Sequence, residues 1–187
     1  MRISGGGARG IPLVLPKGDA VRPATDAMRQ AVFSSIASRV PGVRFLDLFA
    51  GGGGYGLEAL SRGAAGGVFV ERNPKAAACI RQNIEAVCKS LGRGPHDLLV
   101  IGGDATTVPT GGGAAPGLVF IDPPYDAIEE VAPKLFARLG ELLEPVEDPV
   151  IVFEMPGEVT LEPEGWTCVK RLGKGNRQPT VCFFKRA

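Results

Sequence analysis

Short apolar runs alternate with longer amphipathic segments over most of this chain. Runs of this length, bounded by glycine, proline or charged residues, are typical of strands buried in a parallel sheet. We expect such strands at 44–49, 67–71, 98–101, 118–121 and 150–153. Between them, apolar residues recur every three or four positions, which predicts helices. The expected helices cover 55–62, 74–91 and 128–143, and an earlier one begins near Thr25 and ends before Pro41-Gly42.

The order of these elements defines a fold class. Repeated strand–helix units require a mostly parallel sheet with helices on both faces. Two further β-like segments, 166–172 and 180–185, flank a turn region and predict an antiparallel hairpin at the carboxyl-terminal end. We therefore expect one α/β domain, in which residues 1–24 form a Gly/Pro-rich arm or hairpin and residues 25–187 form the main body.

Composition narrows the class of protein. A chain of 187 residues that is 44% hydrophobic suits a single domain with a proper core. No apolar run approaches the roughly 18 residues of a membrane span, and the start lacks a signal-peptide pattern. The four cysteines have no metal-ligand spacing with the single histidine, so we expect no bound metal and a reducing, cytoplasmic location.

The net charge of +1 says little about a polyanionic partner, but Lys and Arg concentrate near both ends of the chain. If both ends meet on one face, these residues would form the basic footprint that phosphate binding needs. Ordinary solvated charge is the alternative interpretation.

A glycine-rich turn follows the strand at 44–49. Its pattern, Gly51-x-Gly53-x-x-Gly56, equals the dinucleotide-binding fingerprint, which is weak evidence by itself. Glycines there allow positive φ and close backbone approach, and they leave helix N–H groups free for a ligand. Asp47 stands inside the strand, where a pyrophosphate-binding loop usually has only apolar residues. A carboxylate at that position can receive an ammonium group, directly or through water.

Acidic residues also follow the next two strands. Glu71 ends the second strand at the spacing expected of an acid that holds ribose hydroxyls. Asp104, after the third, is placed to accept from an adenine amino group, and Ala105 can pack on the ring. Taken singly, Glu71 or Asp104 is better explained as a helix-capping or turn acid. Their succession at the carboxyl ends of successive strands favours a ligand site instead. A ribose and a cationic amino acid tail describe S-adenosylmethionine better than NAD. The residues assigned to this donor site are Asp47, Phe49, Ala50, Gly51, Gly53, Glu71, Arg72, Asp104 and Ala105.

The strand at 118–121 ends in Asp122-Pro123-Pro124-Tyr125. Each proline fixes its own φ and removes a backbone donor, so the segment forms a rigid elbow. It combines a carboxylate, carbonyl oxygens and an aromatic face, which can hold a planar nucleobase by its exocyclic amine. A simple strand-ending turn is the alternative. We take Asp122, Pro123, Pro124 and Tyr125 as the candidate catalytic residues.

Together these motifs resemble a known family, the bacterial 16S ribosomal RNA guanine-N2 methyltransferases of the RsmD type. The segments that match run nearly from end to end of the chain. They are Met1-Arg2-Ile3, Pro16-Lys17-Gly18, 22–26 (Arg-Pro-Ala-Thr-Asp), 46–51 (Leu-Asp-Leu-Phe-Ala-Gly), 56–64, 69–71 and 122–125. The Asp-Pro-Pro-Tyr tetrad is shared by many amino-group methyltransferases, whereas 22–26 and 56–64 are more specific to this family.

The resemblance implies a Rossmann-like methyltransferase fold and S-adenosylmethionine as methyl donor. It implies a guanine of 16S rRNA as acceptor, within a partly assembled 30S subunit, and we expect a monomer. It also places Arg22 and Thr25 over the methionine part of the donor. The chain departs from the family in its opening arm, 4–12, which is poor in Lys and Arg, and in its closing hairpin at 176–179.

Three other functions stay open at this point. One is an amino methyltransferase on DNA adenine or cytosine, or on a protein amide. Another is a non-catalytic RNA-binding assembly factor on the same fold, although such a factor has no physical reason to keep both Asp47 and Asp122. The third is an NAD-dependent dehydrogenase, which Asp47 disfavours.

Overall fold

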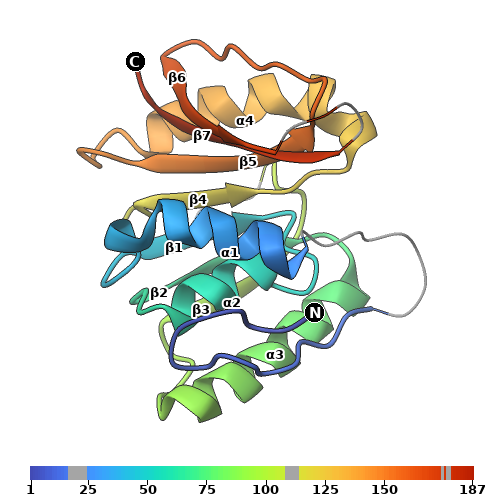
Figure 1. Ribbon diagram of the computed structural model, residues 1–187, viewed down its shortest axis with the longest axis vertical. Coiled ribbons are helices and arrows are strands. Elements are labelled where there is room, and N and C mark those ends of the chain that lie inside the picture. Colours follow the sequence, from blue (N-terminus) through green and yellow to red (C-terminus); the bar gives the residue numbers. More distant parts are fainter. Residues whose placement is uncertain (17–24, 108–113, 174, 176–177) are drawn as a thin grey trace.

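A single mixed sheet forms the centre of the molecule (Figure 1). The structure is a computed structural model, and it describes residues 1–187 apart from 17–24, 108–113, 174 and 176–177. The described residues form seven strands in the order β3-β2-β1-β4-β5-β7-β6. The strands are β1 (Arg44–Leu48), β2 (Gly66–Glu71), β3 (Leu98–Gly102), β4 (Leu118–Ile121), β5 (Val150–Pro156), β6 (Trp166–Leu172) and β7 (Pro179–Arg186).

The first five strands are parallel, and β7 pairs antiparallel with both β5 and β6. From β1 the chain proceeds outward through β2 to β3, then returns to the other side of β1 with β4 and β5. The direction of winding therefore reverses between β1 and β4. In open α/β sheets this switch point is where ligands bind, beyond the carboxyl ends of the strands.

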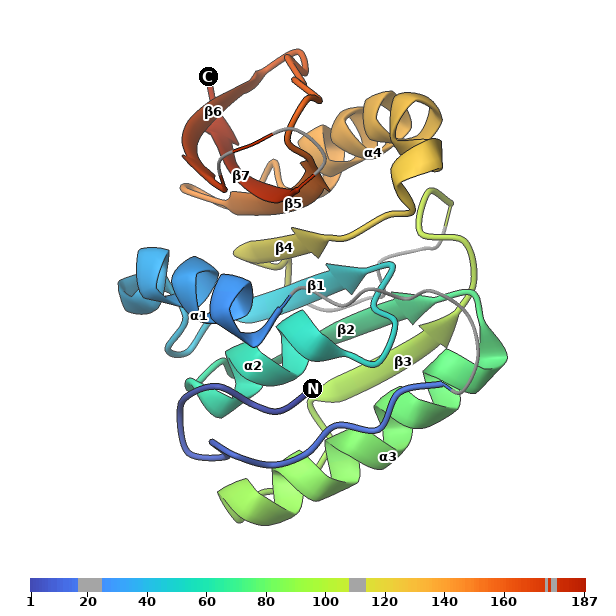
Figure 2. The same ribbon diagram turned by 45° about the vertical axis from the view of Figure 1, so that its right-hand side comes forward.

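Helices cover the two faces of the sheet unequally (Figure 2). Those in the described residues are α1 (Asp26–Ser35), α2 (Gly54–Ser61), α3 (Pro74–Leu91) and α4 (Ile128–Leu142), with short 3-10 turns η1 (Ala37–Arg39) and η2 (Tyr125–Ala127). The first three helices share one apolar core with residues such as Phe45 and Phe120. The fourth packs with Phe153, Phe184 and Trp166 on the opposite face.

The amino-terminal arm folds back on itself and lies along α2 and α3 (Figure 2). Backbone hydrogen bonds join Ile3 to Gly10 and Ile11. The fully buried Glu58 of α2 accepts from the Ser4 N–H (2.8 Å) and hydroxyl (2.7 Å). The buried Asn83 of α3 binds both Val14 and the carbonyl of Gly52, so it ties the arm to the glycine turn.

The expected α/β class, with a mostly parallel sheet and an antiparallel closing hairpin, is confirmed. Two boundaries differ from the expectation by more than one residue. The first helix ends earlier, at Ser35, and a 3-10 turn follows it. Strand β5 extends to Pro156 because its last three residues pair with β7. In the described part of the chain, no helix is both long and apolar enough to cross a bilayer.

Candidate active site

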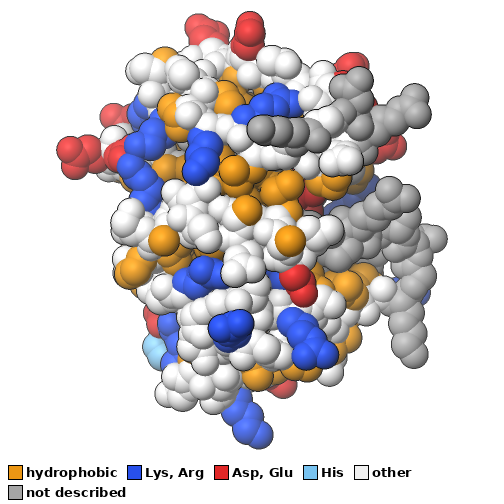
Figure 3. Space-filling view, viewed as in Figure 1, with side chains coloured by type: hydrophobic (Ala, Val, Ile, Leu, Met, Phe, Trp, Pro, Cys, Tyr) orange, Lys and Arg blue, Asp and Glu red, His pale blue; other side chains and the backbone are white. Residues whose placement is uncertain are grey.

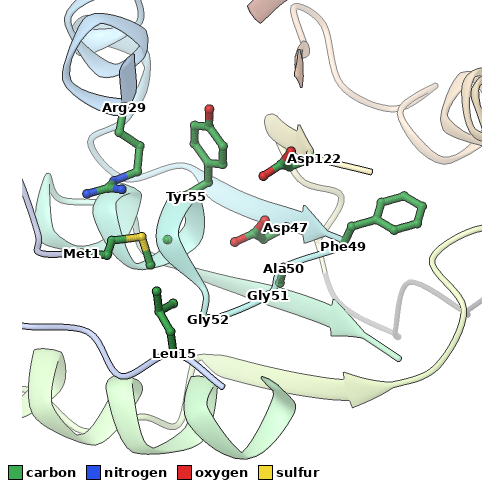
Figure 4. A pocket seen from close by; sticks show the side chains of 11 residues that line it. Met1, Leu15, Arg29, Asp47, Phe49, Ala50, Gly51, Gly52, Tyr55 and Asp122 are labelled. Carbon is green, nitrogen blue, oxygen red and sulfur yellow. The ribbon is translucent and has the colours of Figure 1, made fainter. Parts of the chain in front are cut away.

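A pocket lies at the switch point between β1 and β4 (Figure 4). Its lining includes five residues expected from the sequence: Asp47, Phe49, Ala50, Gly51 and Asp122. It also includes six that the sequence did not indicate: Met1, Leu15, Arg29, Gly52, Gly54 and Tyr55. Figure 4 shows Asp47 and Asp122 turned into one space from neighbouring strands, with Tyr55 beside them and Phe49 pointing away.

The turn after β1 has an unusual backbone. Phe49 has a φ of 57°, the only positive φ of a non-glycine residue in the described chain. Gly51 and Gly53 follow with φ of 54° and 82°, and Gly53 caps α2. A bulky residue held in the left-handed region costs roughly 1–3 kcal/mol and typically marks a functional turn. Gly56, the last glycine of the pattern, packs directly on the rings of Phe45 and Phe69.

Asp47 is 1% exposed, and its Oδ2 accepts from the N–H of Gly56 at 2.8 Å. Burial raises the pKa of Asp47 to about 8; the Gly56 hydrogen bond lowers it and the charge of Glu71 raises it further. A carboxyl with this pKa is mostly protonated at neutral pH. An arriving cation would favour its ionised form.

Glu71, at the end of β2, joins three segments of the donor side. Its carboxylate accepts from Gly51 N–H (2.8 Å) and from Asn73 N–H (2.7 Å). It thereby holds the glycine turn against the start of α3 and stays half-buried at the edge of the sheet. Arg72, its neighbour, is exposed.

Six described donor-site assignments do not line the pocket: Thr25, Gly53, Glu71, Arg72, Asp104 and Ala105. Asp104 is exposed and accepts from the N–H and hydroxyl of Thr106 at 2.8 and 2.7 Å, which hold its pKa below the usual range. Ala105 is buried in the core on the α4 side. Thr25 caps α1 by accepting from Met28 N–H, as its sequence position predicted. Arg22 lies outside the described residues.

The Asp-Pro-Pro-Tyr segment continues the line of β4. The N–H of Asp122 still donates to the carbonyl of Leu48 on β1 (3.4 Å). Burial, with Glu154 and then Asp47 as negative neighbours, raises the pKa of Asp122 well above its usual range. Pro123 is buried, whereas Pro124 is exposed and Tyr125 begins η2 with 43% of its surface exposed.

Sequence analysis missed the residues that surround Asp122. Tyr55 is buried, stacks on Phe120 (5.3 Å between ring centres) and donates to Glu154 Oε2 at 2.8 Å. Glu154 was detectable in principle, because it is the only charged residue in the apolar run Val150–Met155. Arg29, also buried, contacts Asp26 and Glu58 and reaches the pocket from α1.

The arrangement combines a glycine turn, a buried acid and a second acid at the end of the next strand. Such a pocket can hold a cationic ligand on one side and a hydrogen-bond donor on the other. Among the described residues, no group of three or more His, Cys, Asp or Glu side chains has a geometry that could hold a metal ion.

Comparison with solved structures defines the class of the fold. The protein superimposes on a candidate methyltransferase of Escherichia coli, yhhF, with a TM-score of 0.80 and 28% sequence identity. The match covers 100% of this chain and 97% of the other. The fold is therefore the Rossmann-like fold of methyltransferases.

Comparison of sequences then identifies the family. The model of a family described as "Conserved hypothetical protein 95" matches residues 1–184. A candidate rRNA methyltransferase of Bacillus subtilis, YlbH, is 34% identical over 86% of this chain and 85% of its own length. Ribosomal RNA small subunit methyltransferase D of Escherichia coli is 34% identical over 67% of this chain and 60% of its own length. The chain belongs to this family, the RsmD-type methyltransferases, and the resemblance inferred from its motifs is confirmed.

Proposed function

We propose that this protein transfers a methyl group from S-adenosylmethionine to the N2 amino group of a guanine in 16S rRNA. One observation supports the proposal above the others: Asp122 and the glycine turn after β1 line the same pocket. The names of the relatives support an rRNA substrate. The choice of guanine N2 rests on the family resemblance and on the chemistry of the pocket.

On the donor side, the glycine turn and the two acids supply complementary groups. Glu71 would hold the ribose hydroxyls, and Asp47 would face the ammonium group. Asp104, Ala105 and Arg72 would flank the adenosine, with Thr25 and Arg22 near the methionine part. The donor contributes an electrophilic methyl group on a positively charged sulfur. A cation next to buried Asp47 is favoured because it stabilises the ionised carboxylate there.

On the acceptor side, Asp122 and the carbonyl of Pro123 would accept the two hydrogens of the amine. The lone pair of a guanine N2 is delocalised into the ring, so alignment matters more than a strong base. As the nitrogen bonds to the methyl carbon, the carbon–sulfur bond breaks and the nitrogen becomes cationic; its proton then passes to Asp122. Alignment and charge stabilisation of this kind account for most of such accelerations.

Tyr125 offers an exposed ring on which the acceptor base can stack. A base that leaves its helical stack pays a few kcal/mol, and stacking on an aromatic side chain returns about 1–3 kcal/mol. This exchange favours a guanine that is already unpaired, as within a partly assembled 30S subunit. We propose that the protein acts there, in the cytoplasm and as a monomer.

Among the residues that the structure describes, the basic side chains of the two chain ends do not form one cluster. The arm and the β6–β7 hairpin lie at opposite ends of the long axis, and Arg29 is buried (Figure 1). On the face of the molecule seen in Figure 3, Lys and Arg side chains are scattered among apolar ones. Two of the basic side chains, Arg39 and Lys185, bind Asp148. A spread of this kind suits a folded RNA or ribonucleoprotein surface better than a single phosphate track.

The test is transfer of labelled methyl from S-adenosylmethionine to four acceptors: 30S subunits, naked 16S rRNA, DNA and protein. Nucleoside analysis of the product identifies the modified atom. We expect N2-methylguanosine, formed with subunits that lack this modification. N6-methyladenine, N4-methylcytosine or a methylated protein amide would contradict the guanine assignment and indicate an amino methyltransferase with that other acceptor. Binding to rRNA without any transfer would indicate an assembly factor.

A further inference from the structure

A second acid lies beside Asp122 on the same face of the sheet. Ile121, the last residue of β4, pairs with Phe153 of β5, so Asp122, which directly follows β4, lies level with Glu154 of β5. Adjacent strands are about 4.8 Å apart, and side chains at equal level point to the same face. Glu154 is 2% exposed. The structure thus sets a buried carboxyl next to the candidate catalytic one.

Tyr55 fixes the orientation of this second acid. Its hydroxyl donates to Glu154 Oε2 at 2.8 Å, and its ring is held by stacking on Phe120. Tyr55 also lines the pocket together with Asp122, whereas Glu154 is behind them and does not line it. Because Tyr55 donates to Oε2, the other oxygen of Glu154 is the natural place for a proton that faces Asp122.

The surroundings of the two acids favour a shared proton. Neither Asp122 nor Glu154 forms an ion pair with any residue that the structure describes. The charges that act on the cluster are Asp47 on β1 and, through Tyr55, Arg29 on α1. Burial raises the pKa of Glu154, against the lowering effect of the Tyr55 hydrogen bond. Burial also raises the pKa of Asp122, and the negative charge of Glu154 raises it further. Two like charges this close in an apolar site are unfavourable, so one carboxyl keeps its proton.

We propose that Glu154, held by the hydroxyl of Tyr55, is a positioning residue that shares one proton with Asp122 and so prepares Asp122 to take the proton released by the acceptor amine. The proposal rests on the proposed function for the identity of that amine. Before transfer the pair has one negative charge, on Asp122. After the N–CH3 bond has formed and the amine has lost its proton to Asp122, both carboxyls are neutral. A buried site favours that outcome.

The test uses Glu154→Gln, with Glu144→Gln, an exposed residue in the turn after α4, as the matched control. The amide keeps the acceptor for Tyr55 but cannot ionise, and its NH2 can donate to Asp122. Carboxyl ¹³C NMR of the free protein should show the Asp122 titration moving to lower pH by about one unit or more. The acid limb of the pH profile of kcat/KM should also move to lower pH. At neutral pH, kcat should fall about tenfold. Donor affinity should stay within about twofold of the wild type.

Tyr55→Phe provides a second, conservative variant, because it removes the hydroxyl and keeps the ring. We expect the separation between the two carboxyl titrations to change in this variant as well. An Asp122 titration that is unmoved in both folded variants would overturn the proposal. If Glu154→Gln does not fold, the coupling can be measured in Asp122→Asn instead, as a shift in the titration of Glu154. The NMR readout needs no acceptor, so coupled acids without methyl transfer would refute the proposed function alone.

Discussion

The donor half and the acceptor half of the candidate active site hold their acids in different ways. In the donor half, at the ends of β1, β2 and β3, every assigned acid accepts from backbone N–H groups: Asp47 from Gly56, Glu71 from Gly51 and Asn73, and Asp104 from Thr106. In the acceptor half, at the ends of β4 and β5, no backbone N–H of a described residue donates to the Asp122 carboxyl. Glu154 depends on the side chain of Tyr55.

This difference has a physical consequence. Main-chain donors are built into the strand–turn–helix unit, so they survive most single substitutions. The acceptor half depends on a contact between residues 99 positions apart in the chain, Tyr55 and Glu154. We therefore expect side-chain substitutions in the acceptor half to change the reaction, and those in the donor half to change donor binding and stability.

The sharpest separation of the halves should come from Asp122→Ala. Loss of the group that accepts the amine hydrogens and the proton should lower kcat by at least about 10³-fold. Affinity for S-adenosylmethionine, measured by calorimetry, should stay within about twofold. Asp126→Ala, an exposed acid four residues later, is the control and should leave both quantities unchanged. Equal losses of donor affinity and kcat would show that Asp122 belongs to the donor site instead.

Glu71→Ala should show the opposite pattern. It removes the proposed ribose contacts and the acceptor of Gly51 N–H, and each hydrogen bond to a charged group contributes about 1.5–3 kcal/mol. Donor affinity should fall about 30- to 100-fold, with a much smaller effect on kcat at saturating donor. The exposed Glu129 of α4 offers a control for loss of charge alone. Unchanged affinity in Glu71→Ala would refute the ribose assignment.

Two helical glycines compare the packing of the halves. A Cβ on Gly56 would lie 2.4 Å from the Phe69 ring and 2.6 Å from the Phe45 ring, so Gly56→Ala should destabilise the fold by about 2–3 kcal/mol. A Cβ on Gly140 of α4 meets nothing within 4 Å. Gly140→Ala should therefore stabilise by about 0.5–1 kcal/mol. Urea unfolding measures both, and equal effects would contradict the tight donor-side packing.

The effect of Asp47→Asn on stability depends on pH. The folded chain keeps a proton on Asp47 up to about pH 8, whereas the unfolded chain releases it near 4. The unfolded state thus binds fewer protons, and the free energy of unfolding falls as pH rises from about 4 to 8. Asparagine retains an acceptor for Gly56 but cannot ionise, so Asp47→Asn should remove this proton's contribution to the slope, about 1.4 kcal/mol per pH unit between about pH 4 and 8.

The same proton links pH to donor binding. A cation next to Asp47 favours its ionised form, so donor binding near pH 7 should release a proton. Donor affinity should therefore rise by up to about tenfold for each pH unit as the pH increases towards 8. Calorimetry in buffers of different ionisation enthalpy detects the released proton. Asp47→Asn should bind more weakly and lose that release. Identical proton release in the wild type and in Asp47→Asn would contradict a contact between Asp47 and the donor.

The sequence predicts the donor half better than the acceptor half because the contacts of the donor half are local in the chain. The glycine turn, Asp47 and Glu71 are encoded locally, by strand ends and helix starts, and Asp-Pro-Pro-Tyr is likewise a local elbow. Tyr55 and Glu154 meet only because β4 and β5 follow β1 in the sheet, and no local pattern encodes that order. The charge of Glu154 inside an apolar strand was a signal of the same kind as that of Asp47. The extension of β5 to Pro156 depends on pairing with β7 and was equally non-local.

The most direct test of the central claim is a crystal structure with S-adenosylhomocysteine. The account predicts the ribose on Glu71, the ammonium group near Asp47 and the sulfur between the glycine turn and the carboxyl group of Asp122. A ligand seated elsewhere, or a sulfur separated from Asp122 by a wall of protein, would contradict it.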